Sequence, residues 1–253
     1  MEKVVHVEEL SATLGEAQIL NNISFSAFKG EVTVIIGGSG SGKTTMLRHL
    51  LGLLPVETGR VSVLGKDISD MSEEEMKNMY HQMGVFYQNG ALLNSMTVGE
   101  NVAMPLVYQS DLPRSLIRDI VIMKLGLVNL KDAINLFPSQ LSGGMLKRVA
   151  LARAIAMDPP LLFCDEPGAG LDPVSLESLD NLILNLKERL GISIVLVTHE
   201  ISSILRVANR VVFLDQGRSL FEGPLKDALD SEIPQLRDFF SLLRTEMFSS
   251  PTQ

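Results

Sequence analysis

An octapeptide near the start of this 253-residue chain constrains its fold more than any other feature. It reads Gly37-Gly38-Ser39-Gly40-Ser41-Gly42-Lys43-Thr44 and matches the pattern G-x-x-x-x-G-K-[ST]. A strand-like run, "VTVII" at 32–36, precedes it, and apolar residues at helical spacing follow it over 44–54. Glycines let successive backbone N–H groups turn toward one anion, and the helix start adds its positive end. The sequence therefore predicts a strand, a phosphate-binding loop and a helix within an α/β fold.

The residue types in this loop suggest roles for individual side chains. We expect Lys43 to reach the β- and γ-phosphates of a nucleotide and the Thr44 hydroxyl to hold Mg²⁺. We expect Thr45, the next residue, to bind the nucleotide together with residues 37–44.

Two carboxylates after an apolar run form the second chemical signal. In Phe163-Cys164-Asp165-Glu166, we expect Asp165 near the metal and Glu166 one residue further toward the nucleotide. An isolated Asp-Glu pair is usually a solvated turn, but the buried strand before it and the upstream phosphate loop favour a functional site. Glu166 is then the candidate for orienting and deprotonating the attacking water.

Composition narrows the class of protein. The chain is 45% hydrophobic and 21% charged, as in packed globular domains, and its net charge of −8 argues against nucleic-acid binding. The single Cys164, inside an apolar run, excludes an internal disulfide, fits a reducing cytoplasm and is expected to be buried. Mean hydropathy is +0.21, yet the uncharged window 82–99 holds polar residues and three glycines, so no membrane span is expected. Any membrane role is expected to come through a partner.

The order of strand-like and helix-like segments predicts a parallel sheet. Strands are expected in seven apolar or β-branched runs: 4–10, 19–28, 31–36, 60–64, 161–164, 193–198 and 210–214. A helix is expected to begin at Ser72 with a capping box to Glu75, and Met76, Met79 and Met83 are expected to form its core-facing stripe.

Several short motifs occur in an order and spacing that resemble the ATP-binding-cassette (ABC) ATPases. They are the phosphate loop, Gln88, "LSGG" at 141–144, "LLFCDE" at 161–166, "GLD" at 170–172 and His199. The resemblance covers roughly residues 3–225 and implies one ABC ATPase domain at 1–225, followed by a helical tail at 226–253. It implies a P-loop NTPase (RecA-like) α/β core with a mainly parallel sheet, at about 1–90 and 159–225. An N-terminal antiparallel β subdomain and an inserted helical subdomain at about 91–158 complete the implied fold.

The same resemblance implies an ATPase that works as a pair. In the family two copies join head to tail, so that each ATP lies between the phosphate loop of one and the "LSGG" of the other. Ser142, Gly143 and Gly144 would then present donors to the γ-phosphate in trans, and Asp172 would cross the dimer interface. Gln88 would touch the metal and the attacking water, and His199 would contact the γ-phosphate. ATP binding closes such a dimer, and hydrolysis to ADP and phosphate opens it.

Two positions depart from the family pattern. Leu14 stands where most members carry an aromatic residue that stacks on adenine. Leu14 and Ile19 are therefore expected to make only apolar contacts with the base, and the chain is expected to select ATP over GTP only modestly. Met145 follows "LSGG" where most members have Gln or Glu.

Met145 points to one group within the family. The stretches "PSQLSGGMLKRVALARAIAMDPPLLFCDEP" and "YQNGALLNSMTVGENVAMPL" resemble the ATPase subunits of bacterial Mla/Mce-type lipid transporters (MlaF-like). The resemblance implies transport of phospholipid or other hydrophobic molecules across the bacterial envelope. The implied partners are a second copy of the chain, a MlaE-like permease, an Mce-domain protein and a small MlaB-like regulator. The chain would then lie at the cytoplasmic face of the inner membrane, held there by the permease.

Other classes fit less well. Lipoprotein-release (LolD-like) ATPases share "ENVAMPL", but normally read "LSGGE" and have Asn before "LD", where this chain has Gly170. Amino-acid importers fit 88–106 less closely. Non-transport cassettes of DNA repair insert a long coiled coil, those of translation carry two cassettes, and the acidic charge disfavours both. The N-K-x-D motif of small GTPases does not occur.

The motifs do not explain the role of two apolar clusters. Ala91, Leu92 and Leu93 either receive a permease helix or pack the helical subdomain. In the tail, Leu236, Phe239, Phe240, Leu243 and Met247 share one helical face, which contacts either its own chain or the second copy.

Overall fold

The structure of the chain is a computed structural model that describes residues 1–248, with side chains as far as residue 241. It divides into two compact units, which are described separately. One comprises Met1–Met71 with Val197–Gln253, and the other is Ser72–Leu196.

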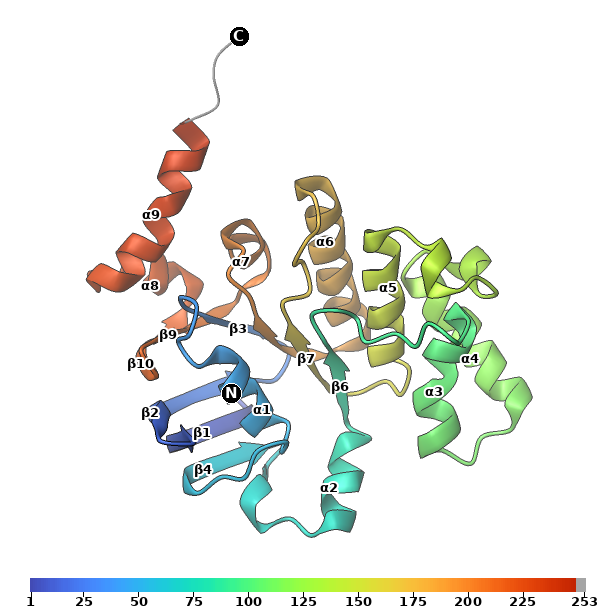
Figure 1. Cartoon of the computed structure of the whole chain (residues 1–253), viewed down its shortest axis with the longest axis horizontal. Coiled ribbons are helices and arrows are strands. Elements are labelled where there is room, and N and C mark those ends of the chain that lie inside the picture. The colour runs from blue at the N-terminus through green and yellow to red at the C-terminus, as the bar shows by residue number, and fades with distance from the viewer. Residues whose placement is uncertain (249–253) are drawn as a thin grey trace. The chain divides into compact units, whose positions relative to one another are not determined.

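The first unit contains an antiparallel sheet in the order β2-β1-β4-β5 (Figure 1). Its strands are β1 (Lys3–Leu14), β2 (Ala17–Phe28), β4 (Thr58–Val63) and β5 (Lys66–Asp67). Val7 lies opposite Phe25 on one side and Val61 on the other, and all three side chains are buried. Because side chains alternate along a strand, this register places one apolar face in the core. The antiparallel N-terminal β region expected from the sequence is confirmed.

The same unit contains the strand that leads into the phosphate loop. β3 (Val32–Ile36) is buried at all five positions and pairs in parallel with β9 (Arg210–Asp215). A strand that the sequence analysis missed, β10 (Arg218–Pro224), returns antiparallel to β9. The helices are α1 (Lys43–Leu50), α7 (Ile201–Val207), α8 (Leu225–Leu229) and α9 (Pro234–Phe248), and η1 (Ile68–Asp70) is a single 3-10 turn. Helix α1 ends before the expected residue 54, because the chain turns at Gly52 with φ of +65°.

Helix α9 contacts its own chain through its first turns. Leu236 is fully buried, and the Phe239 ring lies 5.8 Å from that of Phe213 in strand β9, edge to face. The tail therefore packs on its own subunit here, while the side chains of Leu243 and Met247 lie outside the described residues.

The second unit begins with the capped helix. Ser72 accepts a hydrogen bond from the Glu75 amide and Glu75 bonds back to Ser72, so α2 (Glu73–Tyr80) starts with the expected capping box. The stripe is wrong in one respect: Met79 lies on the helix, but Met83 begins strand β6 (Met83–Phe86). Both side chains are buried, as expected.

Parallel strands of this unit lead to Asp165 and Glu166. β6 pairs in parallel with β7 (Leu161–Asp165), placing Phe86 opposite Cys164, and β8 (Ser193–Val197) follows on the other side of β7. Helix α6 (Pro173–Leu190) connects β7 to β8, with Leu179, Ile183 and Leu186 buried as its periodicity predicts.

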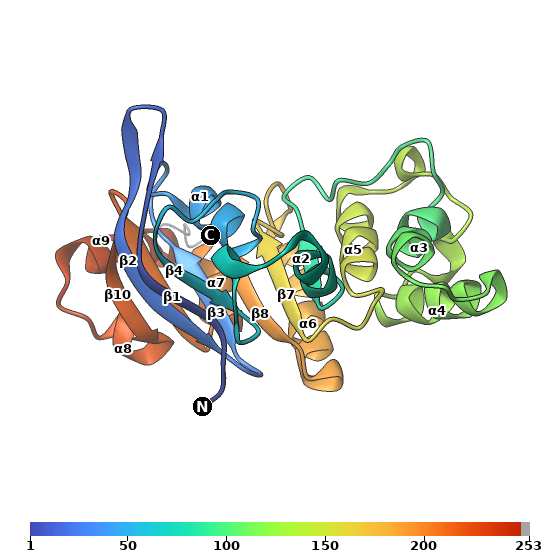
Figure 2. The same cartoon turned by 90° about the horizontal axis from the view of Figure 1, so that it is seen from below.

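Helices predominate between β6 and β7, as expected. They are α3 (Val98–Gln109), α4 (Arg114–Leu127) and α5 (Gly143–Ala154), with 3-10 turns η2 (Lys131–Ala133) and η3 (Pro138–Gln140). The three helices pack together around Val102, Val121 and Val149 (Figure 2). The exact limits of the helical subdomain, 91–158, stay a prediction. Among the described residues, no helix combines the length and apolarity that crossing a membrane requires.

Candidate functional site

The phosphate loop joins β3 to α1 and encloses a lysine. Lys43 Nζ donates hydrogen bonds to the carbonyl oxygens of Gly37 at 2.8 Å and Gly38 at 2.7 Å. Gly42 occupies the N-cap position of α1 in the left-handed conformation, so no side chain caps the helix start. An uncapped helix N-terminus beside an ammonium group provides donors and positive charge for a phosphate.

Two glycines of the loop have no room for a side chain. Gly37 has φ of +149°, and a Cβ there would lie 2.1 Å from the carbonyl oxygen of Leu214. Gly42 has φ of +98°, and its Cβ would lie 2.6 Å from a methyl carbon of Leu20. At both positions, glycine is therefore favoured by the positive φ and by close contacts within the first unit.

A small cavity lies beside the loop, where the sequence predicts the base. It has a volume of about 50 Å³ and is lined by residues of β1, α1 and the segment after α1, including Leu14, Thr45 and His49. Leu14 is 61% exposed, which suits an apolar contact with a ligand rather than core packing. Burial lowers the pKa of His49, while the nearby Leu54 backbone and the charge of Glu57 act in the opposite direction.

Ile19 and His199 complete the predicted set in this unit. Ile19 is half-buried in β2, and its carbonyl oxygen would be 3.1 Å from a Cβ at Gly42. His199 follows β8, and its side chain is 60% exposed, with Nε2 3.8 Å from a carboxylate oxygen of Glu200.

In the second unit the predicted carboxylates and Gln88 leave neighbouring strands. Asp165 is the last residue of β7, and Glu166 follows in the left-handed region at φ of +46°. Gln88 comes two residues after β6 and is exposed. Because β6 and β7 are parallel, these segments leave the same edge of the sheet. Left-handed backbone at a non-glycine residue is strained and is concentrated at functional sites.

Cys164 behaves as expected from its apolar surroundings. It is fully buried, and burial raises the pKa of its thiol. We assign it a packing role.

The "LSGG" segment starts helix α5. Ser142 is its N-cap, and the Ser142 hydroxyl oxygen accepts a hydrogen bond from the Met145 amide at 3.3 Å. A hydroxyl that accepts can still donate its own hydrogen. A Cβ at Gly143 would meet nothing within 4 Å, so the backbone at this helix start is open to an approaching group.

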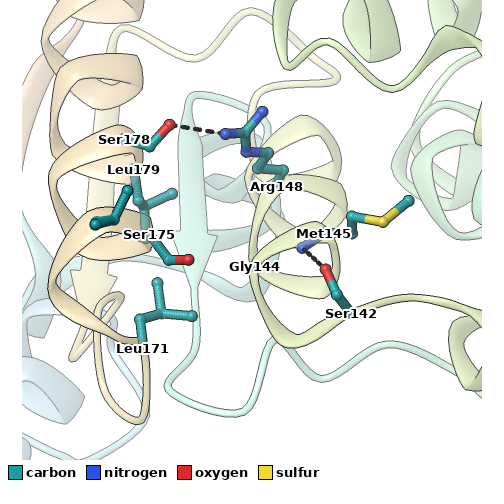
Figure 3. A pocket seen from close by; sticks show the side chains of 9 residues that line it. Ser142, Gly144, Met145, Arg148, Leu171, Ser175, Ser178 and Leu179 are labelled. Atoms are coloured by element: carbon teal, nitrogen blue, oxygen red, sulfur yellow. Dashed lines mark hydrogen bonds between the residues drawn. The ribbon is translucent and has the colours of Figure 1, made fainter.

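Figure 3 shows a pocket of about 370 Å³ between the first turns of α5 and α6. Ser142, Met145 and Arg148 lie on the α5 side, and Leu171, Ser175 and Ser178 lie on the other. Arg148 donates a hydrogen bond to the Ser178 hydroxyl at 2.8 Å. Met145 also lines the pocket, but its side chain extends away from α6 and packs against the helical core (Figure 3).

Asp172 is the N-cap of α6 and follows Leu171, which lines the pocket. Its carboxylate accepts hydrogen bonds from the amides of Val174 at 3.1 Å and Ser175 at 3.0 Å, and the bonds to Ser175 lower the pKa of Asp172. The structure thus brings the predicted in-trans residues of α5 close to the helix that Asp172 caps.

Sequence reasoning missed side chains that hold the segment after β6. Lys147 and Arg153 of α5 donate to main-chain carbonyls there, and buried Asn101 donates to the carbonyl of Leu93 at 3.0 Å. Their acceptors are backbone atoms far away in sequence. The only sequence signal for these contacts is that positions 147, 150 and 153 share one face of a predicted helix. Within the described part of the chain, no group of three or more His, Cys, Asp or Glu side chains could hold a metal ion.

Comparison with known proteins agrees with this geometry. The family model described as "ABC transporter" matches residues 20–169. The intermembrane phospholipid transport system ATP-binding protein MlaF of Haemophilus influenzae is 38% identical over 91% of this chain and 88% of its own length. MlaF of Escherichia coli K12 is 37% identical over 93% of this chain and 88% of its own length. The probable ribonucleotide transport ATP-binding protein mkl of Mycobacterium tuberculosis H37Rv is 37% identical over 94% of this chain, but only 66% of its own length.

Solved structures are similar over nearly the whole chain. A dimeric ATP-binding cassette in a post-hydrolysis state, bound to ADP and Pi, is 30% identical, with a TM-score of 0.78 and coverage of 87% of this chain and 98% of that one. CbiO1 from Clostridium perfringens, part of an ABC transporter complex, is 28% identical, with a TM-score of 0.84 and coverage of 98% of both chains. These matches confirm the predicted α/β fold with its antiparallel and helical parts.

Proposed function

The chain belongs to the ABC transporter family of ATP-binding proteins, and from this premise we propose that it is the ATP-hydrolysing motor of a bacterial phospholipid transporter. The observation that carries the proposal is the similarity to MlaF proteins along more than nine-tenths of the chain. Met145 supports it as well, because this residue marked the lipid-transport group in the sequence and lines the pocket beside Ser142.

The phosphate loop is the ATP-binding element of the proposal. Residues 37–45 would surround the phosphates, and Lys43 would exchange its contacts with Gly37 and Gly38 for the β- and γ-phosphates. Leu14 and Ile19 would contact the base through apolar surface alone. ATP binding is a property of the family, whereas these individual contacts are our proposal.

Three side chains would carry the hydrolysis. Glu166 would accept the proton of the attacking water, Gln88 would orient that water, and His199 would donate to the γ-phosphate. The exposure of Gln88 and His199 is consistent with contact to a ligand. General-base catalysis contributes roughly 10²–10⁴ to a rate, which sets the loss expected for Glu166→Gln.

The donor chemistry of three predicted ligands fits Mg²⁺. Thr44 offers a hydroxyl, Asp165 a carboxylate and Gln88 an amide oxygen, and Mg²⁺ favours one or two carboxylates together with phosphate oxygens over an all-protein site. When bound, the ion would neutralise charge on the β- and γ-phosphates.

A second copy would complete the site. Ser142 and Gly143 are exposed, and together with Gly144 they offer a hydroxyl donor and a helix start, which suits a phosphate supplied by another chain. Asp172 would lie at the same interface. The head-to-tail pair is supported by the dimeric cassette among the similar structures.

The transport partners follow from the lipid-transport proposal. A MlaE-like permease would hold the chain at the cytoplasmic face of the inner membrane, and an Mce-domain protein and a small MlaB-like regulator would be further partners. Ala91 and Leu93 are exposed, Leu93 by 42%, while Leu92 packs against the helical core. Ala91 and Leu93 are therefore candidates for permease contact, and Leu92 is a packing residue.

The proposal is tested by purifying the tagged chain from its native host in mild detergent. An Mce-domain protein and a permease that copurify would support it, and a lipoprotein-releasing permease would overturn it. Leu93→Asp should lose the permease while keeping its melting temperature, whereas Leu92→Asp should lower that temperature. ATP hydrolysis by the wild type, and its loss in Glu166→Gln, would test the motor separately.

The mycobacterial relatives suggest a second candidate, because they are named probable ribonucleotide transport ATP-binding proteins. Reconstituting the purified complex distinguishes the two. Phospholipid in the vesicles should stimulate ATP hydrolysis under our proposal, whereas stimulation by added ribonucleotides alone would favour the second.

A further inference from the structure

Two cations on helix α5 donate hydrogen bonds to main-chain carbonyls of one short segment, residues 88–91, which we call the switch segment. Lys147 Nζ donates to the carbonyl oxygen of Gln88. Arg153 Nη1 donates to that of Ala91 at 2.7 Å, and Nη2 donates to that of Gly90 at 2.6 Å. The contacts fix the first residue and the last two residues of the switch segment to a single helix.

The backbone of the switch segment packs directly on α5 between these cations. Gly90 and Ala91 both have left-handed backbones, with φ of +69° and +48°, so the chain turns sharply here. A Cβ at Gly90 would lie 3.3 Å from the Cβ of Ala150, which places the turn against the helix surface. Residues three positions apart share a helix face, so Lys147, Ala150 and Arg153 form one contact surface for the turn.

Lys147 also lies close to the end of the strand that precedes Gln88. Its ammonium lies 5.7 Å from the ring centre of Phe86, the last residue of β6. Partial burial lowers the pKa of Lys147, and the negative charge of Glu166 opposes this and favours the ammonium form. One side chain of α5 therefore interacts with the end of β6, the Gln88 carbonyl and the carboxylate after β7.

The two cations are suited to different tasks. A guanidinium is planar and presents several N–H groups in a fixed fork, so Arg153 can hold two successive carbonyls at once. A lysine ammonium can reach one of these carbonyls but does not reproduce the fork. Backbone carbonyls do not ionise, so their capacity to accept these hydrogen bonds does not change with pH.

We propose that Lys147 and Arg153 are positioning residues that lock the switch segment to α5, so that Gln88 and the "LSGG" start of α5 move together. The inference rests on the proposed roles of Gln88 and Ser142 and names the side chains that couple them. A displacement at the exposed Leu93, two residues beyond the switch segment, would then reach Ser142 through the rigid helix rather than along the intervening chain.

Hydrogen exchange of the full, nucleotide-free chain tests the lock directly. Two amides report on it: Gly90 N–H donates to the Tyr87 carbonyl at 2.7 Å, and Leu93 N–H donates to Asn101 Oδ1 at 2.8 Å. In Lys147→Met and Arg153→Lys, peptides covering 87–93 should exchange roughly tenfold faster or more, because each variant removes a charged hydrogen bond. Lys147→Arg should restore protection, and Arg118→Met, an exposed cation on α4, should match the wild type.

ATP turnover provides the second measurement. Lys147→Met should lower kcat while leaving KM for ATP nearly unchanged, because Lys147 is no part of the phosphate loop. Unchanged exchange at 87–93 in both variants would overturn the proposal. Uniform acceleration across α3, α4 and α5 would overturn it too, because it would indicate a general packing role.

The exchange measurement does not depend on ATP hydrolysis, so it decides the lock even if the proposed motor function is wrong. Lys147 is half-buried on the helix surface, so Lys147→Met carries the test should Arg153→Lys fail to fold.

Discussion

Replacing Gly37 with alanine adds one methyl group at the tightest point of the phosphate loop. The added carbon would lie 2.1 Å from the carbonyl oxygen of Leu214 and 2.7 Å from the Ser41 hydroxyl. The Leu214 oxygen belongs to the backbone of strand β9 and cannot rotate away. The loop must therefore move by roughly 1 Å to reach ordinary contact distances.

The size of the effect follows from this strain. Holding a non-glycine residue in a sparsely populated backbone region, such as φ of +149°, costs about 1–3 kcal/mol. The loop relieves the strain by leaving the conformation that directs its N–H groups at phosphate. Since about 1.4 kcal/mol corresponds to a factor of ten, ATP affinity should fall roughly 5- to 150-fold.

Isothermal titration calorimetry of ATP into the full chain measures this loss, and the loop contains its own control. A Cβ at Gly38 would meet nothing within 4 Å, and the backbone there has no positive φ. Gly38→Ala should therefore bind ATP within about threefold of the wild type. Equal losses in the two variants, or wild-type affinity in Gly37→Ala, would refute the steric reasoning.

Two further predictions concern stability. The Lys124 side chain is 1% exposed and donates to Asp158, whose side chain is 62% exposed. Asp158→Asn should lower the free energy of unfolding by roughly 2 kcal/mol because it leaves the buried ammonium without its counter-charge, and Lys124→Met should lower it by less. Urea unfolding that ranks the two variants the other way would contradict this. The pKa of His49 is lowered in the folded state, so below pH 6.5 the folded state binds fewer protons than the unfolded state. The contribution of neutral His49 to the free energy of unfolding is therefore complete above pH 6.5 and is lost as the pH falls toward the folded-state pKa. The stability difference between wild type and His49→Leu should change there by at most about 1.4 kcal/mol per pH unit, and a pH-independent difference would exclude the His49 effect.

The predicted site was accessible from sequence where the chemistry depends on consecutive residues. In our proposal, the phosphate loop, the Asp165–Glu166 pair and "LSGG" would each act through a few adjacent backbone or side-chain groups at the start of a helix or the end of a strand. Gly37 illustrates the point: the requirement for glycine reads directly from the motif, although its cause, the Leu214 carbonyl, lies far along the chain.

The missed elements lack a local signal. β6 is only four residues long, and Gly84 interrupts the continuous apolar run that is typical of a buried strand. Glycine is needed there because a Cβ would lie 2.4 Å from the Ala154 carbonyl oxygen, a contact that only the folded chain shows. β10 carries polar and half-exposed residues and is held by pairing with β9. Lys147 and Arg153 have no local signal either, because their acceptors are carbonyls that only tertiary packing brings close.

In the proposed pair, each nucleotide site needs residues from two copies of the chain. The most direct measurement is the specific ATPase activity over a dilution series, for the wild type and for Ser142→Asp. Aspartate caps a helix as well as serine does, so α5 should keep its start, while the added negative charge repels the γ-phosphate. We predict that wild-type specific activity falls on dilution and that Ser142→Asp is inactive at every concentration while still binding ATP. Constant specific activity on dilution, together with an active Ser142→Asp, would contradict the account.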